Sequence, residues 1–311
     1  MCVCVCMLLR CPQIGSTENI PLPGKTFCAR VSFCALASGL RSSAHCSVST
    51  SVVFLKYDNH MNGRYLAEIT QQVFSDLEAS KYTLAEYRLS IYGRAMSEWS
   101  RLAAWVVDNR LASPNVRWMI QIPRLYEMYK AKGHIRCFQD MLLNIFKPLF
   151  DVSVDPASDP KLHQFLALIV GFDSVDDESR HESQRDAVLP LPAAWDLPEQ
   201  PPYHYWTFFI AENLKSLNLL RASRGLSQFS YRPHAGEAGD PDHLAAAFLT
   251  AEGVNHGINL TAVPALQYLY YLAQVGIAVS PLSNNRLFLE YSKSPFLKFF
   301  QRVSSCCAAQ R

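Results

Sequence analysis

Residues 228–239 read QFSYRPHAGEAG, a stretch that joins a strand-like run to a loop of polar and glycine residues. The run 228–232 has the composition of a β-strand, and His234 follows it directly. A neutral imidazole can bind zinc, and Glu237, three residues further on, can face the same pocket and carry a proton. Histidine and glutamate at this spacing are commonly ordinary neighbours in a loop or helix. Their place at a strand end, flanked by glycines, makes them candidates for a functional site.

Helix-like and strand-like segments alternate from residue 57 onward. Helices are predicted at 63–80, 97–112, 138–150, 206–223, 243–252, 265–274 and 295–303. Strands are predicted at 87–92, 116–122, 166–172, 228–232, 255–258 and 275–280, with a proline-rich loop at 183–202. Repeated strand-then-helix units indicate parallel strands in an open doubly wound sheet or a (β/α)8 barrel. No Gly-x-Gly-x-x-Gly turn follows the first strand, which argues against a nucleotide-binding Rossmann sheet.

Polar residues stand at the ends of three successive predicted strands. His234 and Glu237 follow the first, His256 and Gly257 end the second, and SPLSNN (280–285) leaves the third. The plainer interpretation of His256 is a strand-end histidine with a structural hydrogen bond. In a parallel barrel, however, the carboxyl ends of the strands meet at one mouth. Three polar strand ends in a row therefore favour the barrel over the open sheet.

Five segments give the chain a family resemblance. They are AEYRLSIYGR (85–94), WMIQIPRLY (118–126), GFDSVDDES (171–179), SYRPHAGEAG (230–239) and SPLSNNRLFLEY (280–291). In this order they resemble AMP deaminases, within the adenosine/AMP deaminase superfamily, over roughly residues 55–303. The resemblance implies a (β/α)8 TIM-type barrel and the hydrolysis of AMP to IMP and ammonia. It implies His234 as a zinc ligand, Glu237 as the residue that contacts the purine and protonates N1, and His256 as the base that deprotonates the attacking water.

The resemblance also implies one Zn²⁺ held by four residues, of which His234 is one. The expected His-x-His pair does not occur among the nine histidines, and SSCCAAQR (304–311) stands where a Ser-x-Asp-Asp-Pro segment is expected. We therefore expect a barrel truncated at both ends, which lacks strands 1 and 8, leaves the edges at 87–92 and 275–280 unpaired and binds zinc weakly. The alternative function is a catalytically inactive family member that binds or regulates complete deaminase subunits.

Residues 1–54 differ in composition from the rest. They hold seven of the ten cysteines and one acidic residue, Glu18. We expect an unfolded leader here, with a transit segment as the alternative, a partial barrel at 55–303 and an unrelated tail at 304–311. One cysteine, Cys137, lies within the barrel region, which is typical of a reduced cytosolic protein. The 29 basic and 27 acidic residues form no basic block, so we expect no nucleic-acid partner, and no apolar run is long enough to span a membrane. The expected partners are AMP and, by resemblance, further copies of the chain in a tetramer.

Overall fold

The computed structural model describes residues 5–8, 30–33, 56–180, 182, 188–280, 284 and 290–299. The strands are β1 (Val5–Leu8), β2 (Arg30–Phe33), β3 (Leu84–Ser90), β4 (Val116–Pro123), β5 (Ile169–Val175), β6 (Ser230–Tyr231), β7 (His234–Ala235), β8 (Gly253–His256) and β9 (Gly276–Val279). The α-helices are α2 (Arg64–Ser80), α3 (Ser97–Asp108), α4 (Tyr126–Ala131), α5 (Phe138–Val154), α6 (Pro160–Leu166), α7 (Tyr203–Ser223), α8 (Asp242–Thr250) and α9 (Pro264–Leu272). Two 3-10 helices are η1 (Ile258–Ala262) and η2 (Tyr291–Lys293).

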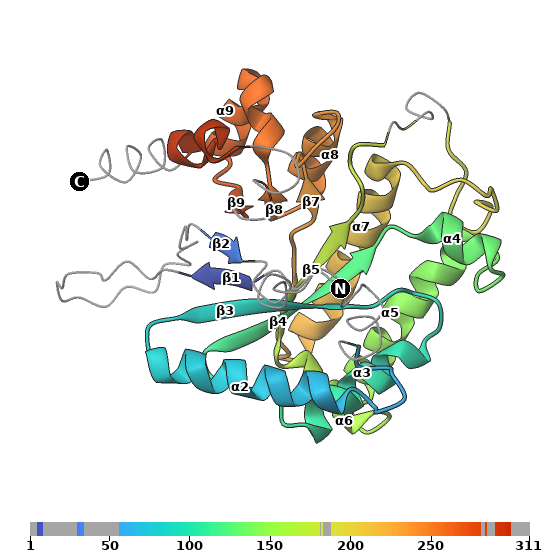
Figure 1. Cartoon of the computed structure of the whole chain (residues 1–311). Helices are drawn as coiled ribbons and strands as arrows, with labels where there is room; N and C mark the ends of the chain where they lie inside the picture. The colour runs from blue at the N-terminus through green and yellow to red at the C-terminus, as the bar shows by residue number, and fades with distance from the viewer. Residues whose placement is uncertain are drawn as a thin grey trace, which may run out of the picture.

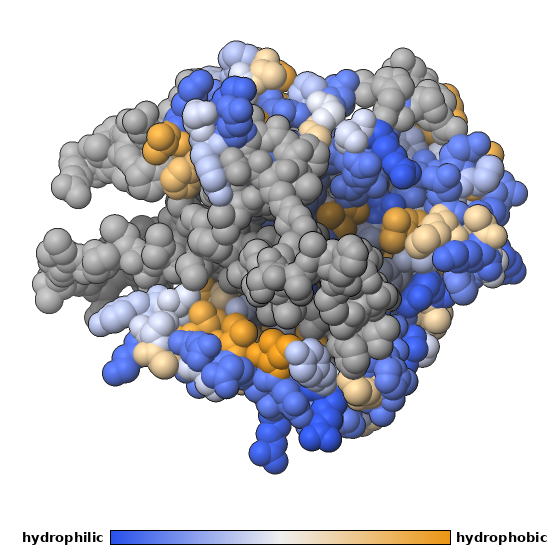
Figure 2. All heavy atoms as spheres, viewed as in Figure 1, coloured by the Kyte–Doolittle hydropathy of each residue, from blue (hydrophilic) through white to orange (hydrophobic). Residues whose placement is uncertain are grey.

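This part of the chain has an α/β fold with one sheet in which most neighbouring strands are parallel. Figure 1 shows α2, α3 and α6 along β3 and β4, and α8 and α9 beside the short strands β7 to β9. The larger apolar core lies around β3, β4 and β5, and a smaller one lies between β7 to β9 and helices α8 and α9. Among the coloured residues in Figure 2, hydrophilic side chains predominate and apolar patches lie between them. Among the described helices, none has the length and apolar character needed to cross a bilayer.

One broken strand joins the two ends of the sheet. The strand order is β6-β5-β4-β3-β1-β2-β9-β8-β7, so β6 and β7 are its two ends although only Arg232 and Pro233 separate them in the chain. The backbone N–H of Arg232 donates to the carbonyl of Phe172 on β5, and the carbonyl of Pro233 accepts from Asn255 on β8. The carbonyls of Tyr231 and Pro233 accept the N–H groups of Glu252 and Asn255, whereas the N–H of Arg232 faces β5, so this segment lies between β5 and β8 and pairs with both. The predicted strand 228–232 is therefore shorter than expected and is followed by a second, β7.

The edges expected to be unpaired have partners. β1 pairs with β3 in antiparallel fashion, β2 pairs with β9 in parallel, and β1 and β2 pair with each other. The expectation of two open edges is wrong for this reason. Both strands come from residues 1–54, which we expected to be unfolded. The rest of that leader lies outside the described residues, as does the tail 304–311.

The other differences from the predicted elements have local causes. The strand predicted at 166–172 begins at Ile169, because residues up to Leu166 belong to α6. The side chain of Asp159 accepts the N–H of Leu162 and Pro160 follows it, which together start a helix at this point. The helix predicted at 295–303 is helical at 296–299 and lies otherwise outside the described residues.

Candidate active site

His234 lies in β7 and is almost entirely buried, with 5% of its surface exposed. Its Nδ1 lies 2.9 Å from Oδ1 of Asp173 on β5. A carboxylate can only accept a hydrogen bond, so Nδ1 of His234 carries the hydrogen, and in the neutral ring Nε2 is the acceptor nitrogen. A metal bound by His234 would therefore use Nε2. A carboxylate on the other ring nitrogen is the usual partner of a metal-binding histidine.

Asp173 is fully buried, and a cation balances its charge. Its Oδ2 lies 2.8 Å from Nε of Arg88 on β3, which is also buried. Nη2 of Arg88 donates at 2.6 Å to Oδ1 of Asn255 on β8, and Nδ2 of Asn255 donates at 2.7 Å to the carbonyl of Arg232. Burying a charge is costly unless it is paired and hydrogen-bonded. These contacts therefore favour one arrangement of β3, β5, β7 and β8 around the inside of the sheet.

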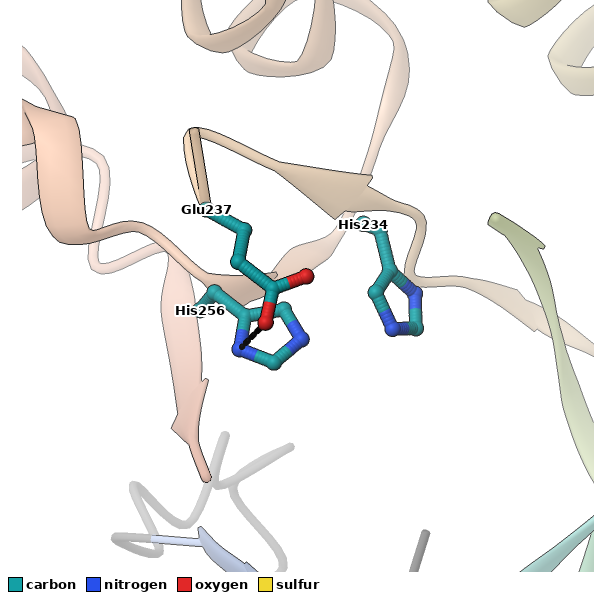
Figure 3. Close-up of side chains that lie close together, drawn as sticks. All are labelled: His234, Glu237 and His256. Carbon is teal, nitrogen blue, oxygen red and sulfur yellow. Dashed lines mark ion pairs between the residues drawn. The ribbon is translucent and has the colours of Figure 1, made fainter. Parts of the chain in front are cut away.

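Asn284 joins the partly exposed Glu237 and the buried His256 into a second group. Its Nδ2 lies 3.0 Å from Oε1 of Glu237 and 3.0 Å from Nδ1 of His256, and it has one hydrogen for each. Oε1 of Glu237 lies 3.4 Å from the same Nδ1 of His256 (Figure 3). Burial lowers the pKa of His256 well below its usual value, and the nearby His234 and Arg88 lower it further. His256 is therefore neutral at neutral pH and able to accept a proton.

The backbone at His256 is held in an uncommon conformation. Its φ is 73°, and the following Gly257 has φ 61°. A residue with a side chain is rarely found in this left-handed region, and such residues concentrate at functional sites. The turn carries the imidazole of His256 from the end of β8 toward Glu237 and His234.

Two buried histidines and the partly exposed Glu237 can approach one metal ion. His234, Glu237 and His256 each offer a ligand atom, and these atoms lie within 4.8 Å of one another. Two ligands of a single zinc ion are at most about 4.2 Å apart, so small side-chain movements suffice to bring the three within range. Two imidazoles and one carboxylate form a donor set that suits catalytic zinc. The donor chemistry present therefore fits a metal.

Two side chains hold the backbone of residues 234–239, here called the motif loop. Oε2 of Glu178 accepts the N–H groups of Gly236 at 2.6 Å and Glu237 at 3.1 Å. The hydroxyl of Tyr203 on α7 donates to the carbonyl of His234 at 2.7 Å. Burial raises the pKa of Tyr203 well above its usual value, so the hydroxyl keeps the proton that it donates.

His243 on α8 touches both of these side chains. Its ring stacks on Tyr203 with centroids 4.0 Å apart, and its nitrogens lie 3.7 Å from Glu178 and 3.6 Å from Glu182. Burial by itself lowers the pKa of His243, but the two carboxylates outweigh it and the pKa is raised. Burial also opposes ionisation of Glu182, yet His243, Arg124 and the backbone N–H of Tyr203 bring its pKa to about 2. A charged histidine between two carboxylates thus supports the motif loop from outside.

The structure brings together His234, Glu237 and His256, the three residues singled out at strand ends. From the third strand end, 280–285, Asn284 joins them, and residues 281–283 and 285 lie outside the described part. No role for Asp173 or Glu178 was predicted from the sequence. Both lie in the acidic segment 173–179 that follows the strand predicted at 166–172, and acidic residues at a strand end could have indicated a site. His243 was also missed, because it opens a helix and carries no local sign of its contacts.

Comparison with known proteins shows which family these features belong to. A family model described as AMP deaminase matches residues 46–307. The chain is 57% identical over 250 residues to AMP deaminase of Schizosaccharomyces pombe and 58% identical over 250 residues to AMP deaminase of Arabidopsis thaliana. Each match covers 80% of this chain and 30% of the relative, so the chain spans less than a third of these relatives' length. An adenine deaminase structure from Arthrobacter aurescens is similar at a TM-score of 0.41 and 15% identity over 76% of this chain and 58% of that one, too weakly to decide the fold.

Gly239→Ala should destabilise the protein more than Gly225→Ala, its matched control. Both glycines have positive φ, 66° and 69°, which costs alanine about 1 kcal/mol at either position. A Cβ at Gly239 would lie 1.9 Å from the carbonyl oxygen of Glu178, whereas a Cβ at Gly225 has no neighbour within 4 Å. We expect a further loss of about 1–3 kcal/mol at Gly239, measured by urea unfolding. Equal losses would show that the motif loop does not pack against the backbone of Glu178.

His243→Gln should lower the thermal stability at acidic pH more than at alkaline pH. The folded-state pKa of His243 is raised above 6.5, so its charged contacts stabilise fully below pH 6.5 and are lost as the pH rises through the raised pKa. Removing one partner of a buried charge pair costs about 3–5 kcal/mol, which sets the upper limit of the expected effect near pH 5.5. Melting curves at several pH values measure it, with His204→Gln, at an exposed histidine on α7, as control. A difference that grows toward alkaline pH would contradict the charged state of His243.

Proposed function

The chain belongs to the AMP deaminase family, and on that premise we propose that it carries part of the active site that converts AMP and water to IMP and ammonia. The observation that carries the proposal is the convergence of His234, Glu237 and His256 at the carboxyl ends of parallel strands. His234 lies in β7, Glu237 in the motif loop and His256 at the end of β8. Side chains of these types can bind a metal or transfer a proton. AMP offers an amino group on C6 and a basic N1, which such a site can act on.

Of the three side chains that could approach a metal, His234 alone binds zinc in this proposal, and Glu237 and His256 carry out the proton transfers beside it. Nδ1 of His234 is held by Asp173, which fixes the ring and directs Nε2 to the metal. Zinc, when bound, supplies a Lewis acid that makes a water molecule nucleophilic near neutral pH. Arg88 pairs with the other oxygen of Asp173 and so holds the carboxylate in place. Both residues therefore position His234 and do not touch the substrate.

Glu237 and His256 would carry the protons. His256 is neutral, and its Nδ1, the nitrogen that accepts from Asn284 here, would take the proton from the attacking water. Glu237 contacts the purine and gives a proton to N1 as the oxygen adds to C6. The proton that His256 took from the water then moves to the amino group on the resulting tetrahedral carbon, this group leaves as ammonia, and the oxygen on C6 returns a proton to Glu237. Asn284 supports these roles, because its two N–H groups hold Glu237 and His256 side by side.

The proposal for the fold is a (β/α)8-type barrel that lacks strands 1 and 8 of the family. The segment that contains β6 and β7 supports it, since this segment pairs with β5 at one end and with β8 at the other. The β1–β2 pair lies between β3 and β9, the place where strands 1 and 8 of the family barrel are expected. A barrel interior also accounts for the series of buried side-chain contacts that runs from His234 on β7 through Asp173 and Arg88 to Asn255 on β8.

Three further properties belong to the proposal on family grounds. They are a homo-oligomer, a tetramer by resemblance; a cytosolic location; and AMP as the small-molecule partner. The family unit would be residues 55–303. The buried core of this region supports its being a folded unit, since it joins α2 through α7 to the sheet.

A chimera tests the proposed function without depending on the length of this chain. Residues 56–299 would replace the matching segment of the Schizosaccharomyces pombe AMP deaminase, which is 57% identical over 250 residues. The chimera should release IMP and ammonia from AMP. Because general acid–base catalysis contributes 10²- to 10⁴-fold, we expect Glu237→Gln and His256→Ala to lower kcat by about that range. His234→Ala should also remove the bound zinc, measured by elemental analysis.

The control is His163→Ala, at a half-buried histidine on α6 away from the strand ends. It should leave zinc content and kcat unchanged. An active chimera that is indifferent to His234→Ala or to His256→Ala would refute the assigned roles. A folded, zinc-loaded chimera that does not act on AMP would refute the proposed reaction.

A further inference from the structure

A groove of about 920 Å³ runs between α7 and α8, away from the active site. Along it, large apolar side chains stand in solvent: Phe208 is 49% exposed, Leu219 is 69% exposed and Leu249 is 82% exposed. The opposite side of α7 packs into the core through residues such as Trp206 and Leu217. Apolar side chains gathered around one groove mark an interaction site.

Four residues of α7 form a stripe along this groove: Phe208, Glu212, Lys215 and Leu219. Steps of four, three and four residues place them on one face of the helix, over a length of about 17 Å. The two ends of the stripe are apolar, and its centre holds one acid and one base. The sequence of the stripe is therefore suited to a copy of itself that runs in the opposite direction.

We propose that this stripe and its groove form a two-fold interface with a second copy of the chain. In a two-fold dimer the same patch is used by both copies. With the axis passing between residues 213 and 214, Phe208 of each copy faces Leu219 of the other, and Glu212 faces Lys215. The exposed Leu249 on α8 forms the far wall of the groove that receives the second α7.

The two charges select this arrangement over others. Within one chain Nζ of Lys215 lies 3.5 Å from Oε1 of Glu212, and both side chains are largely exposed, so this pair contributes little by itself. In a parallel arrangement Glu212 would face Glu212 and Lys215 would face Lys215, which is repulsive. Only the antiparallel arrangement pairs opposite charges, twice per dimer. Charge pairs of this kind set orientation and specificity more than affinity.

The inference deepens the homo-oligomer part of the proposed function and does not depend on catalysis. Sedimentation equilibrium on the full chain tests it, with circular dichroism to confirm folding of each variant. Glu212→Lys and Lys215→Glu should each weaken self-association by about tenfold or more, because each places like charges in contact. The double variant restores opposite charges and should return the dissociation constant to within about threefold of the original chain.

Two controls match these changes. Glu68→Lys reverses one charge of an exposed ion pair with Arg64 on α2, and Leu272→Ser removes a leucine on α9 that is 57% exposed. Both should leave self-association unchanged, whereas Leu219→Ser should weaken it.

Each remaining outcome is decisive. If the chain self-associates and the α7 substitutions have no effect, the proposed interface is wrong and the proposed homo-oligomer is not contradicted. A chain that stays monomeric at about 100 µM overturns both. Two weakened single variants without recovery in the double variant overturn the pairing of Glu212 with Lys215.

Discussion

Asp173 is a carboxylate with no exposed surface that binds Nδ1 of His234 through one oxygen and Nε of Arg88 through the other. A buried charge of this kind tolerates little movement, because either partner lost would leave it uncompensated. Its partners come from β7 and β3, which are distant in the chain and in the strand order. The sheet must therefore curve until β7 lies next to Asp173, and the segment of β6 and β7 allows this because it pairs with β5 through β6 and with β8 through β7. The place of His234 follows from this constraint.

The rest of the site is built outward from that pair. Glu178 and Tyr203 hold the backbone on either side of Ala235, so Glu237 leaves the motif loop in a fixed direction. Asn284 then aligns Glu237 with His256, whose left-handed backbone brings the ring back over the strand ends. Burial and neighbouring charges set the pKa of both His256 and His243, and the neighbours of the two histidines have opposite charge. His256 is buried beside cationic and imidazole groups, whereas His243 is buried between two carboxylates.

The sequence was enough to predict the alternation of strands and helices and the meeting of His234, Glu237 and His256, because parallel strands place their carboxyl ends together. It was not enough to predict how Pro233 divides one strand, since the apolar pattern of 228–232 continues across the break. Residues 166–168 were assigned to a strand because the apolar run is continuous from the end of α6 into the start of β5. Arg88 and Asn255 contact each other 167 positions apart, and no local pattern encodes such a contact. The pairing of β1 and β2 with β3 and β9 was missed because their segments carry no sustained period.

The central claim is that Asp173 fixes the tautomer and direction of His234 while Asn284 fixes those of His256. Long-range ¹H–¹⁵N NMR of the imidazole rings at neutral pH tests it most directly, with His234→Ala and His256→Ala to assign the two signals. The account predicts a hydrogen on Nδ1 of His234, donated to Asp173, and none on Nδ1 of His256, which accepts from Asn284. An unprotonated Nδ1 in His234, or a protonated Nδ1 in His256, would contradict it.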